Sequence, residues 1–364
     1  MKQRPFKKGI CMRVSRAYIL FFQPSSTYDL NISSLLKNDN GLSRTKKWVT
    51  YTGYSSSPIE VSEKEMLTLG NIDELKEYEV KKLIDSFGEK VIESLISKKL
   101  LIDKDKEKKI NLYNESSKDI PWHPLALIYY QSGRWKDKNL SSGSKINFGI
   151  EHKFIYEKKS NPPPFRYQRS KFKSKLLKLP SAKFKTPLNH LLSERKTCRD
   201  FDKSKQISFK NFAYIIESVF KAKEFRKLSN DLEVVRRNSP AGGSIHSVEP
   251  YFFISRVEGI ESGIYHYLSL DHALEKLPIK LENEDIDKLM QEVVAHQDDF
   301  NGVAALCIMT TRFDRKLWKY RNHAKALRIC NMDAGHLSQN FYLTCSEVKL
   351  GALCTGAIND KRIE

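Results

Sequence analysis

Residues 236–253, RRNSPAGGSIHSVEPYFF, place a group of turn-forming residues directly before an apolar, aromatic run. Ser239, Pro240 and the Gly242-Gly243 pair predict a turn, because proline stiffens the backbone and glycine admits positive φ. The following stretch YFFISRV (251–257) has the composition of a buried strand. Since glycine also lets a ligand approach the backbone closely, the turn is either an ordinary tight connection or a ligand-binding loop at a sheet edge.

The sequence after residue 187 predicts alternating helices and strands. We expect helices near 187–195, 208–222, 284–297 and 322–347, and strands at 251–257, 263–267, 272–277, 303–311 and 350–358. The strands 263–267 and 272–277 are predicted to form a hairpin, and 322–347 is the longest helix, with an apolar stripe along one side. This grouping predicts an α+β domain with helices on both faces of one sheet.

The first half of the chain predicts a helical module. Ser62 and Glu65 have capping-box spacing, and two amphipathic helices follow, separated by Phe87-Gly88. The stretch KKLLIDKDKEKKINLY (98–113) is expected to form a β-wing after them, which gives a winged-helix-like domain. A helical hairpin without a recognition role is the alternative, and periodicity does not separate a DNA reader from a peptide reader.

A basic, proline-rich segment separates the two halves. Residues 162–187 open with three prolines, and eight Lys or Arg residues but no acid occur between 166 and 185. Such composition favours an extended backbone, so we expect a linker. The predicted organisation is an N-terminal domain over 1–160, a linker over 161–186 and a C-terminal domain over 187–364.

The composition limits the class of protein. The 364 residues carry a net charge of +19, which attracts polyanions such as nucleic acid, acidic peptides or phosphorylated cofactors, or simply gives a solvated basic surface. The six cysteines have neither metal-site spacing nor the pattern of a disulfide framework, so reduced thiols are expected. No apolar run of about 20 residues is present. These features predict a cytoplasmic protein.

The stretch SERKTCRDF (193–201) is a candidate anion site. Arg195 and Arg199 lie four residues apart on either side of Thr197, so on a helical end two guanidinium groups and a hydroxyl can converge. Arginine offers a rigid set of donors that suits a phosphate. A solvated basic patch is the alternative.

The stretch 314–340 contains further candidates. Lys319 and Tyr320 are adjacent, and a buried lysine beside a tyrosine is suited to proton transfer. His323, Asp333 and His336 invite a metal-site interpretation, but their spacing is poor, so capping or hydrogen bonding in a dimer interface is favoured. Dinucleotide, Walker, zinc-protease and serine-hydrolase signatures are all absent from the sequence.

Several stretches in order resemble one enzyme family. RKTCRDF (195–201), SPAGGSIHSVEPY (239–251), GIYHYLSLDHALEKL (263–277), FDRKLWKYRNHA (313–324) and DAGHLSQN (333–340) resemble the SagB-type (McbC-like) FMN-dependent dehydrogenases of the nitroreductase superfamily. This resemblance covers roughly residues 187–360. WHPLALIYYQSGRW (122–135) and NPPPF (161–165) are similar to a narrower subgroup of peptide-maturation dehydrogenases.

The resemblance implies a nitroreductase-like fold, in which helices flank a mostly antiparallel sheet, a homodimer and bound FMN. It assigns the phosphate and ribityl chain of FMN to Arg195, Thr197 and Arg199. The isoalloxazine ring would lie against Ser239, Pro240, Ala241, Gly242 and Gly243, and Gln297 would make a further ring contact. Proton removal would fall to Lys319 and Tyr320. A last phosphate contact would fall to Lys361 or Arg362, because the sequence ends at Glu364.

The resemblance also implies an activity. The enzyme would oxidise thiazoline or oxazoline rings to azoles in a ribosomally made precursor peptide, beside a companion cyclase, while the N-terminal domain binds an acidic leader. One alternative is flavin-dependent reduction of dehydroamino acids in a peptide. Another is a flavin-free scaffold that binds a peptide or nucleic acid. The complete set of site residues disfavours the scaffold, and with it nucleic acid as a partner.

Overall fold

A computed structural model describes residues 12–30, 42–141, 177–180, 185–229, 232–279 and 285–363. The chain divides into an N-terminal unit, Met1–Arg134 with Phe313–Leu327, and a C-terminal unit, Trp135–Arg312 with Arg328–Glu364. The sequence predicts one C-terminal domain over 187–364, whereas the structure groups 313–327 with the N-terminal unit. The predicted linker lies almost entirely outside the described residues.

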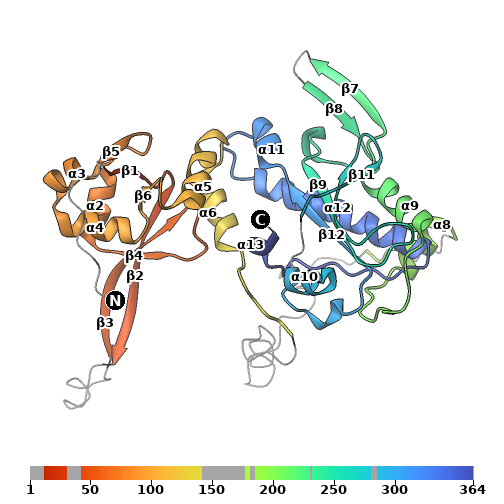
Figure 1. Ribbon diagram of the computed structural model, residues 1–364. Helices are drawn as coiled ribbons and strands as arrows, with labels where there is room; N and C mark the ends of the chain where they lie inside the picture. Colours follow the sequence, from red (N-terminus) through yellow and green to blue (C-terminus); the bar gives the residue numbers. More distant parts are fainter. Residues whose placement is uncertain are drawn as a thin grey trace. The chain divides into compact units, whose positions relative to one another are not determined.

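The C-terminal unit is built on a four-stranded antiparallel sheet with the order β11-β10-β9-β12 (Figure 1). Its strands are β9 (Val248–Ile254), β10 (Gly263–Leu268), β11 (Ala273–Lys276) and β12 (Ala305–Thr311). Successive residues point to opposite faces, so that Phe252 packs in one apolar cluster and Phe253 in another. The four strands predicted between residues 251 and 311, including the β10–β11 hairpin, are confirmed.

Helices cover both faces of this sheet. α9 (Phe209–Phe220) and α12 (Ala326–Glu347) pack on the face that contains Phe252, and α10 (Ile286–Val293) packs on the opposite face. The remaining elements of the unit are α8 (Pro187–Glu194), η1 (Gly242–Ser244), η2 (Asp298–Phe300), α13 (Asp360–Ile363) and a two-stranded ribbon, β7 (Glu224–Ser229) with β8 (Leu232–Arg236). The predicted α+β class is therefore confirmed.

The strand predicted at 350–358 is wrong. Leu350 and Ala352 do pack against the core, as an apolar run should. The backbone nevertheless forms no strand ladder, because its polar groups bond to scattered partners, both side chains and single backbone groups such as the Cys198 N–H, which donates to the Ala352 carbonyl at 3.0 Å. The Cys354 N–H, for example, donates to the hydroxyl of Tyr342 at 2.8 Å. Apolar composition alone cannot reveal where the backbone hydrogen bonds of a segment go.

The N-terminal unit contains two small antiparallel sheets. One has the order β5-β1-β6 and the other the order β2-β3-β4. Their strands are β1 (Arg13–Arg16), β2 (Leu20–Leu30), β3 (Leu42–Thr52), β4 (Ile59–Val61), β5 (Glu77–Glu79) and β6 (Leu101–Asp103). Three helices, α2 (Glu63–Gly70), α3 (Val80–Phe87) and α4 (Glu89–Ser97), share one apolar cluster with β1, β4 and β6. The two helices expected on either side of Gly88 are thus confirmed.

The β-wing expected over 98–113 does not form. Only Leu101–Asp103 is a strand, and it pairs with β1 rather than with the residues that follow it. The second half of the expected wing belongs to α5 (Lys108–Asp119). A short apolar run followed by mixed lysines and acids fits a strand and a helix almost equally, so the pattern does not distinguish them.

The segment 313–327 belongs to the N-terminal unit through a second apolar cluster. α6 (Pro124–Ser132) contributes Leu127 to this cluster, and Trp122 precedes the helix. α11 (Phe313–Lys319) contributes Phe313, whose ring centroid lies 4.7 Å from that of Trp122, and a fully buried Leu317. Within the described ranges, no helix is long and apolar enough to cross a membrane.

The capping box at the start of α2 is more extensive than its sequence pattern indicates. The Glu65 carboxylate accepts hydrogen bonds from the Ser62 N–H at 2.6 Å, from the Ser94 hydroxyl at 2.6 Å and from Lys98 Nζ at 2.7 and 2.8 Å. Burial alone would raise the pKa of Glu65, but the hydrogen bonds from Lys98, Ser62 and Ser94 outweigh it and lower the pKa. This carboxylate therefore ties α2 to α4.

Replacing Glu65 with glutamine should lower the free energy of unfolding by about 2–3 kcal/mol at neutral pH, because a buried, charge-assisted network loses its anion. A folded-state pKa below the unfolded value means that the stabilisation is present at neutral pH and is lost as the pH falls through the folded-state pKa. Urea denaturation at several pH values measures both effects. The exposed Glu63, changed to glutamine in the same helix, is the control, and equal losses for the two variants would contradict this assignment.

Candidate functional site

The loop Ser239–Ser244 adopts a conformation that its glycines permit. Gly243 has φ 64° and Ser244 has φ 58°, so two successive residues lie in the left-handed region. The loop is closed by hydrogen bonds from the Ser244 N–H to the Ala241 carbonyl at 3.0 Å and from the Ile245 N–H to the Gly242 carbonyl at 3.3 Å. A β-branched residue at Gly243 would be strained in this conformation.

Two polar side chains of α12 hold this loop from one side. The Gly242 N–H donates to Asp333 Oδ1 at 2.9 Å, and Asn340 Nδ2 donates to the Ser239 hydroxyl at 2.8 Å. Asp333 and Asn340 are seven residues apart, about two helical turns, so both project from the same side of α12. Asp333 and Ser239 are buried. The loop is therefore fixed by α12 before any ligand arrives.

The role of Asp333 was missed by sequence reasoning, which considered it as a metal ligand, a cap or a dimer contact. In the described part of the chain, no cluster of three metal-ligating side chains occurs. His323 instead accepts the Lys325 N–H at Nδ1, at 3.1 Å, as a local cap. The seven-residue spacing of Asp333 and Asn340 was the signal that could have pointed to a shared binding face.

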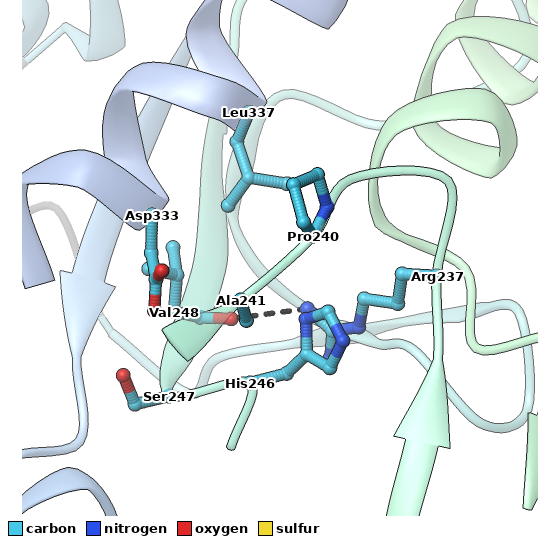
Figure 2. Close-up of a pocket in the computed structure, with 8 residues that line it drawn as sticks. All are labelled: Arg237, Pro240, Ala241, His246, Ser247, Val248, Asp333 and Leu337. Carbon is cyan, nitrogen blue, oxygen red and sulfur yellow. Dashed lines mark hydrogen bonds between the residues drawn. The ribbon is translucent and has the colours of Figure 1, made fainter. Parts of the chain in front are cut away.

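A small polar pocket adjoins the loop (Figure 2). Arg237 Nη2 donates to the Ser269 hydroxyl at 2.9 Å and Nη1 to the Val248 carbonyl at 3.3 Å, which fixes the guanidinium at the pocket wall. The lining residues are Arg237, Pro240, Ala241, His246, Ser247, Val248, Asp333 and Leu337. The pocket thus combines a cation, an imidazole and a carboxylate with the apolar faces of proline and leucine.

The predicted arginine cluster follows α8 but is not helical. α8 ends at Glu194, and the cap residue Arg195 already has φ −57° and ψ 119°. The expected convergence on a helical end is therefore wrong, because a helix C-terminus presents carbonyl groups and the chain leaves it in an extended conformation. The Arg195 guanidinium lies 5.5 Å from the ring centroid of Tyr342, and Arg199 Nε bonds Asp299 Oδ2 at 2.9 Å.

Helical geometry places the loop and the arginine cluster on opposite sides of α12. Asp333, which holds the loop, and Tyr342, on which Arg195 stacks, are nine residues apart, or about two and a half turns. Nine residues also correspond to about 14 Å along the helix axis. The two groups of predicted ligand-binding residues are thus carried by one helix, on opposite sides of it.

Gln297 lies at the end of the segment after α10, and its side chain is engaged within the protein. Nε2 donates to the carbonyls of Val294 and Ala357, both at 2.7 Å, and Oε1 accepts from the Thr355 hydroxyl at 3.1 Å. These bonds hold the residues before α13 against the end of α10. The structure therefore gives Gln297 a structural role, and its predicted ring contact stays a prediction.

Lys319 and Tyr320 lie at the end of α11, in the N-terminal unit, whereas the loop and the arginines lie in the C-terminal unit. The burial expected of Lys319 is not found, because its side chain is exposed, and the lysine that is fully buried is Lys316, one turn earlier. Tyr320 is half-buried and packs in the apolar cluster around Trp122. The sequence signal that distinguishes the buried Lys316 from the exposed Lys319 is the helical periodicity of α11, which orients Lys316 and Leu317 inward.

The comparison with protein families agrees with this architecture. The model of the nitroreductase family matches residues 192–364, a range that contains the whole four-stranded sheet, the glycine loop and the arginine cluster. Residues 192–364 are a nitroreductase-family domain. The match starts within α8. Most residues of the nitroreductase domain also belong to the C-terminal unit, but the domain includes residues 313–327, which the contacts group with the N-terminal unit.

Individual relatives are distant. The chain is similar to the protein named Putative nitroreductase MJ1384 of Methanocaldococcus jannaschii, with 22% identity over 48% of this chain and 81% of that protein. It is also similar to the trifolitoxin-processing protein TfxB of Rhizobium leguminosarum bv. trifolii, with 28% identity over 36% of this chain and 35% of that protein. A chain of the E. coli microcin synthetase McbBCD complex with truncated pro-MccB17 bound aligns with 17% identity and a TM-score of 0.44, over 65% of this chain and 82% of that one.

Nitroreductase-family proteins typically bind FMN, and the residues present here fit that group. Arg195, Arg199 and the Thr197 hydroxyl supply the donors that a phosphate requires, and the ion pair with Asp299 uses only the Nε–H of Arg199. Gly242 and Gly243 add no side chain to the outer surface of the loop, which leaves room for a flat ring.

Proposed function

We propose that this protein is an FMN-dependent oxidoreductase that acts on a precursor peptide and oxidises thiazoline or oxazoline rings to azoles. The observation that carries the proposal is the glycine loop of the nitroreductase domain, which the buried Asp333 holds in a preformed left-handed conformation. Similarity to a protein that is named for trifolitoxin processing supports a role in the maturation of another molecule.

In this proposal Arg195, Thr197 and Arg199 hold the phosphate and ribityl chain, and residues 239–243 lie against the ring. Bound FMN supplies the two-electron acceptor for the hydride that leaves the azoline ring. Lys319 Nζ takes the proton from a ring carbon, and the Tyr320 hydroxyl orients the lysine. Lys319 and Tyr320 belong to the N-terminal unit, and the proposed FMN contacts belong to the C-terminal unit.

We further propose that the N-terminal unit is the peptide-recognition domain, with α3 and α4 as its helical part. The helices meet at Gly88, whose φ of 91° allows the sharp break between them. The chain's net charge of +19 suits an acidic leader peptide, and ring formation before oxidation requires a companion cyclase.

A homodimer would complete the FMN site. The glycine loop and the arginine cluster lie on opposite sides of α12, so one chain cannot easily present both to the same FMN molecule, whereas two copies can. α8, which precedes Arg195, has no buried residue, and Leu188 and Leu192 are 59% and 49% exposed. Leucines four residues apart form one apolar side of a helix, which a second copy would cover.

The proposed function is tested by the visible absorption spectrum of the purified full-length protein and by the flavin that heat releases. We expect about one FMN per chain. The protein is then incubated with synthetic peptides that contain a thiazoline or an oxazoline, and mass spectrometry should show the loss of two hydrogens. A protein that binds no added FMN contradicts the proposal. Oxidation of NADPH coupled to reduction of a dehydroalanine peptide, without azoline oxidation, would reverse the proposed direction.

The shared site is tested by mixing two defective chains. Arg195→Ala should lose the phosphate contact, and Gly243→Val should distort the loop, so neither variant alone should retain FMN. In a heterodimer with separately tagged chains, one of the two sites would combine an intact arginine cluster with an intact loop. We therefore expect about one FMN per heterodimer. A heterodimer without FMN would place both groups of residues in the site of one chain.

A further inference from the structure

The β7–β8 ribbon is a feature that the proposed function does not use. It extends away from the four-stranded sheet (Figure 1) and joins α9 to the glycine loop. The strands pair from Glu224 opposite Arg236 to Ser229 opposite Leu232, and no third strand pairs with either of them among the described residues. A two-stranded ribbon with two open edges is only marginally stable by itself, and its free backbone groups can pair with another chain.

One side of this ribbon carries a basic and aromatic stripe. Because strand side chains alternate, Lys223, Phe225 and Lys227 point to the same side, about 7 Å apart. Phe225 is 50% exposed and lies opposite the half-buried Val235. By contrast Val234, which points to the other side, is buried. The stripe is thus the side of the ribbon that faces outward.

The charges on the ribbon are unbalanced. Glu224 is neutralised by Arg236 at 2.8 Å. Within the described residues, no ion pair within 4 Å involves Lys223, Arg226 or Lys227. Glu233 lies opposite Lys227 on the same side of the ribbon, and Glu217 of α9 interacts electrostatically with Lys223, so these two acids stand against three cations. An exposed phenylalanine between two lysines favours an anionic segment that also carries an apolar side chain.

We propose that β7 is a docking edge for an extended acidic peptide segment, which adds to the ribbon as a further strand with the pattern acidic-x-apolar-x-acidic. In such a strand, alternate side chains lie on the same side as Lys223, Phe225 and Lys227, so the two acids meet the two lysines and the apolar residue meets Phe225. The pattern reads the same in both chain directions. Strand addition also satisfies the open backbone groups of β7.

A peptide fits this edge better than a nucleic acid does. A peptide strand repeats its side chains at the spacing of the stripe and supplies amides to the strand edge, whereas a phosphodiester supplies none. The position also favours a substrate, because only two residues, Arg237 and Asn238, separate the end of β8 from the loop Ser239–Ser244. This inference rests on the proposed function in one respect: the docked segment is taken to be part of the precursor peptide.

The test uses fluorescein-labelled nine-residue peptides, titrated with the full-length protein and followed by fluorescence anisotropy. The probe has the core Glu-Thr-Phe-Thr-Glu between threonine and serine flanks. We expect it to bind at least about tenfold more tightly than the same peptide with lysine in place of glutamate. Lys223→Glu combined with Lys227→Glu should weaken binding about tenfold, and so should Phe225→Ser. The control is Lys210→Glu combined with Lys288→Glu, which makes the same charge change at exposed lysines of the same unit.

Two further peptides test strand addition itself. One peptide is N-methylated at its threonines, and the other is N-methylated at its glutamates and phenylalanine. Because the backbone N–H groups of alternate residues point to opposite edges of a strand, only one of these two sets can bond to β7. One peptide should therefore lose binding and the other retain it. Equal binding of both would overturn strand addition, and equal weakening by the control variant would overturn the site.

A labelled single-stranded oligonucleotide that binds more tightly than the acidic peptide, and that loses affinity in the same variants, would assign the ribbon to nucleic acid instead. The FMN content of each variant is measured in parallel and should not change. A protein without FMN would contradict the proposed function, whereas the peptide titration would still decide the docking edge.

Discussion

Lys319→Ala should leave FMN bound and lower the rate of azoline oxidation by about a hundredfold or more, because the ring carbon loses its proton acceptor. FMN should stay bound because Lys319 lies in the N-terminal unit, outside the unit that carries the predicted phosphate and ring contacts. Single-turnover mass spectrometry of an azoline peptide measures the rate, and the absorption spectrum measures the bound FMN.

Lys325→Ala is the matched control for this experiment. Lys325 is exposed, lies six residues further along the same segment and engages His323 only through its backbone N–H. The control should therefore retain the wild-type rate. A Lys319→Ala protein that is fully active with FMN bound would remove Lys319 from the mechanism, and the buried Lys316 would become the residue to test.

Asp333→Ala should weaken FMN binding roughly thirtyfold, which corresponds to about 2 kcal/mol, because the Gly242 N–H loses a charged, buried acceptor and the loop is no longer held in its left-handed conformation. Asp333→Asn keeps an acceptor oxygen and should lose less. Titration of the apoprotein with FMN measures both dissociation constants.

Asn331→Ala, at an exposed position two residues earlier on α12, is the control for helix stability. Circular dichroism and thermal melting show whether each variant is folded. If Asp333→Ala binds FMN as tightly as the unaltered protein does, the loop does not depend on its anchor, and the observation that carries the proposed function loses its force.

The regular elements of the C-terminal unit could be predicted because their patterns are strong. The continuous apolar run of β12 and the alternating side chains of β9 and β10 leave few alternatives to buried strands. Ser208 and Asp285 accept hydrogen bonds from the first turns of α9 and α10, and both are common capping residues, so these helix starts were recognisable as well. The hairpin of β10 and β11 was visible from the turn residues between its strands.

The failures have a different physical origin. Residues 350–358 are apolar enough for a strand, but their backbone groups bond to individual partners such as the Tyr342 hydroxyl and the Cys198 N–H instead of to a neighbouring strand, and a local pattern carries no record of this. The predicted domain bounds stay a prediction, but the grouping of 313–327 with the N-terminal unit depends on contacts of Phe313 and Leu317 with residues nearly 200 positions earlier, which no local pattern reveals. Asp333 was misjudged for a related reason: its partner is a backbone N–H, which every residue other than proline possesses.

The path of residues 313–327 makes the two units difficult to separate. The segment leaves β12, buries Leu317 and Ala326 in the N-terminal unit and returns through α12. A protein shortened to residues 187–364 would keep all predicted FMN ligands, yet the Lys319–Tyr320 segment would lose the surface on which it folds. Exchange of the N-terminal half between related enzymes would likewise replace the packing partners of the proton acceptor. Under the proposed function, peptide recognition and ring oxidation would then change together when one half of the chain is exchanged.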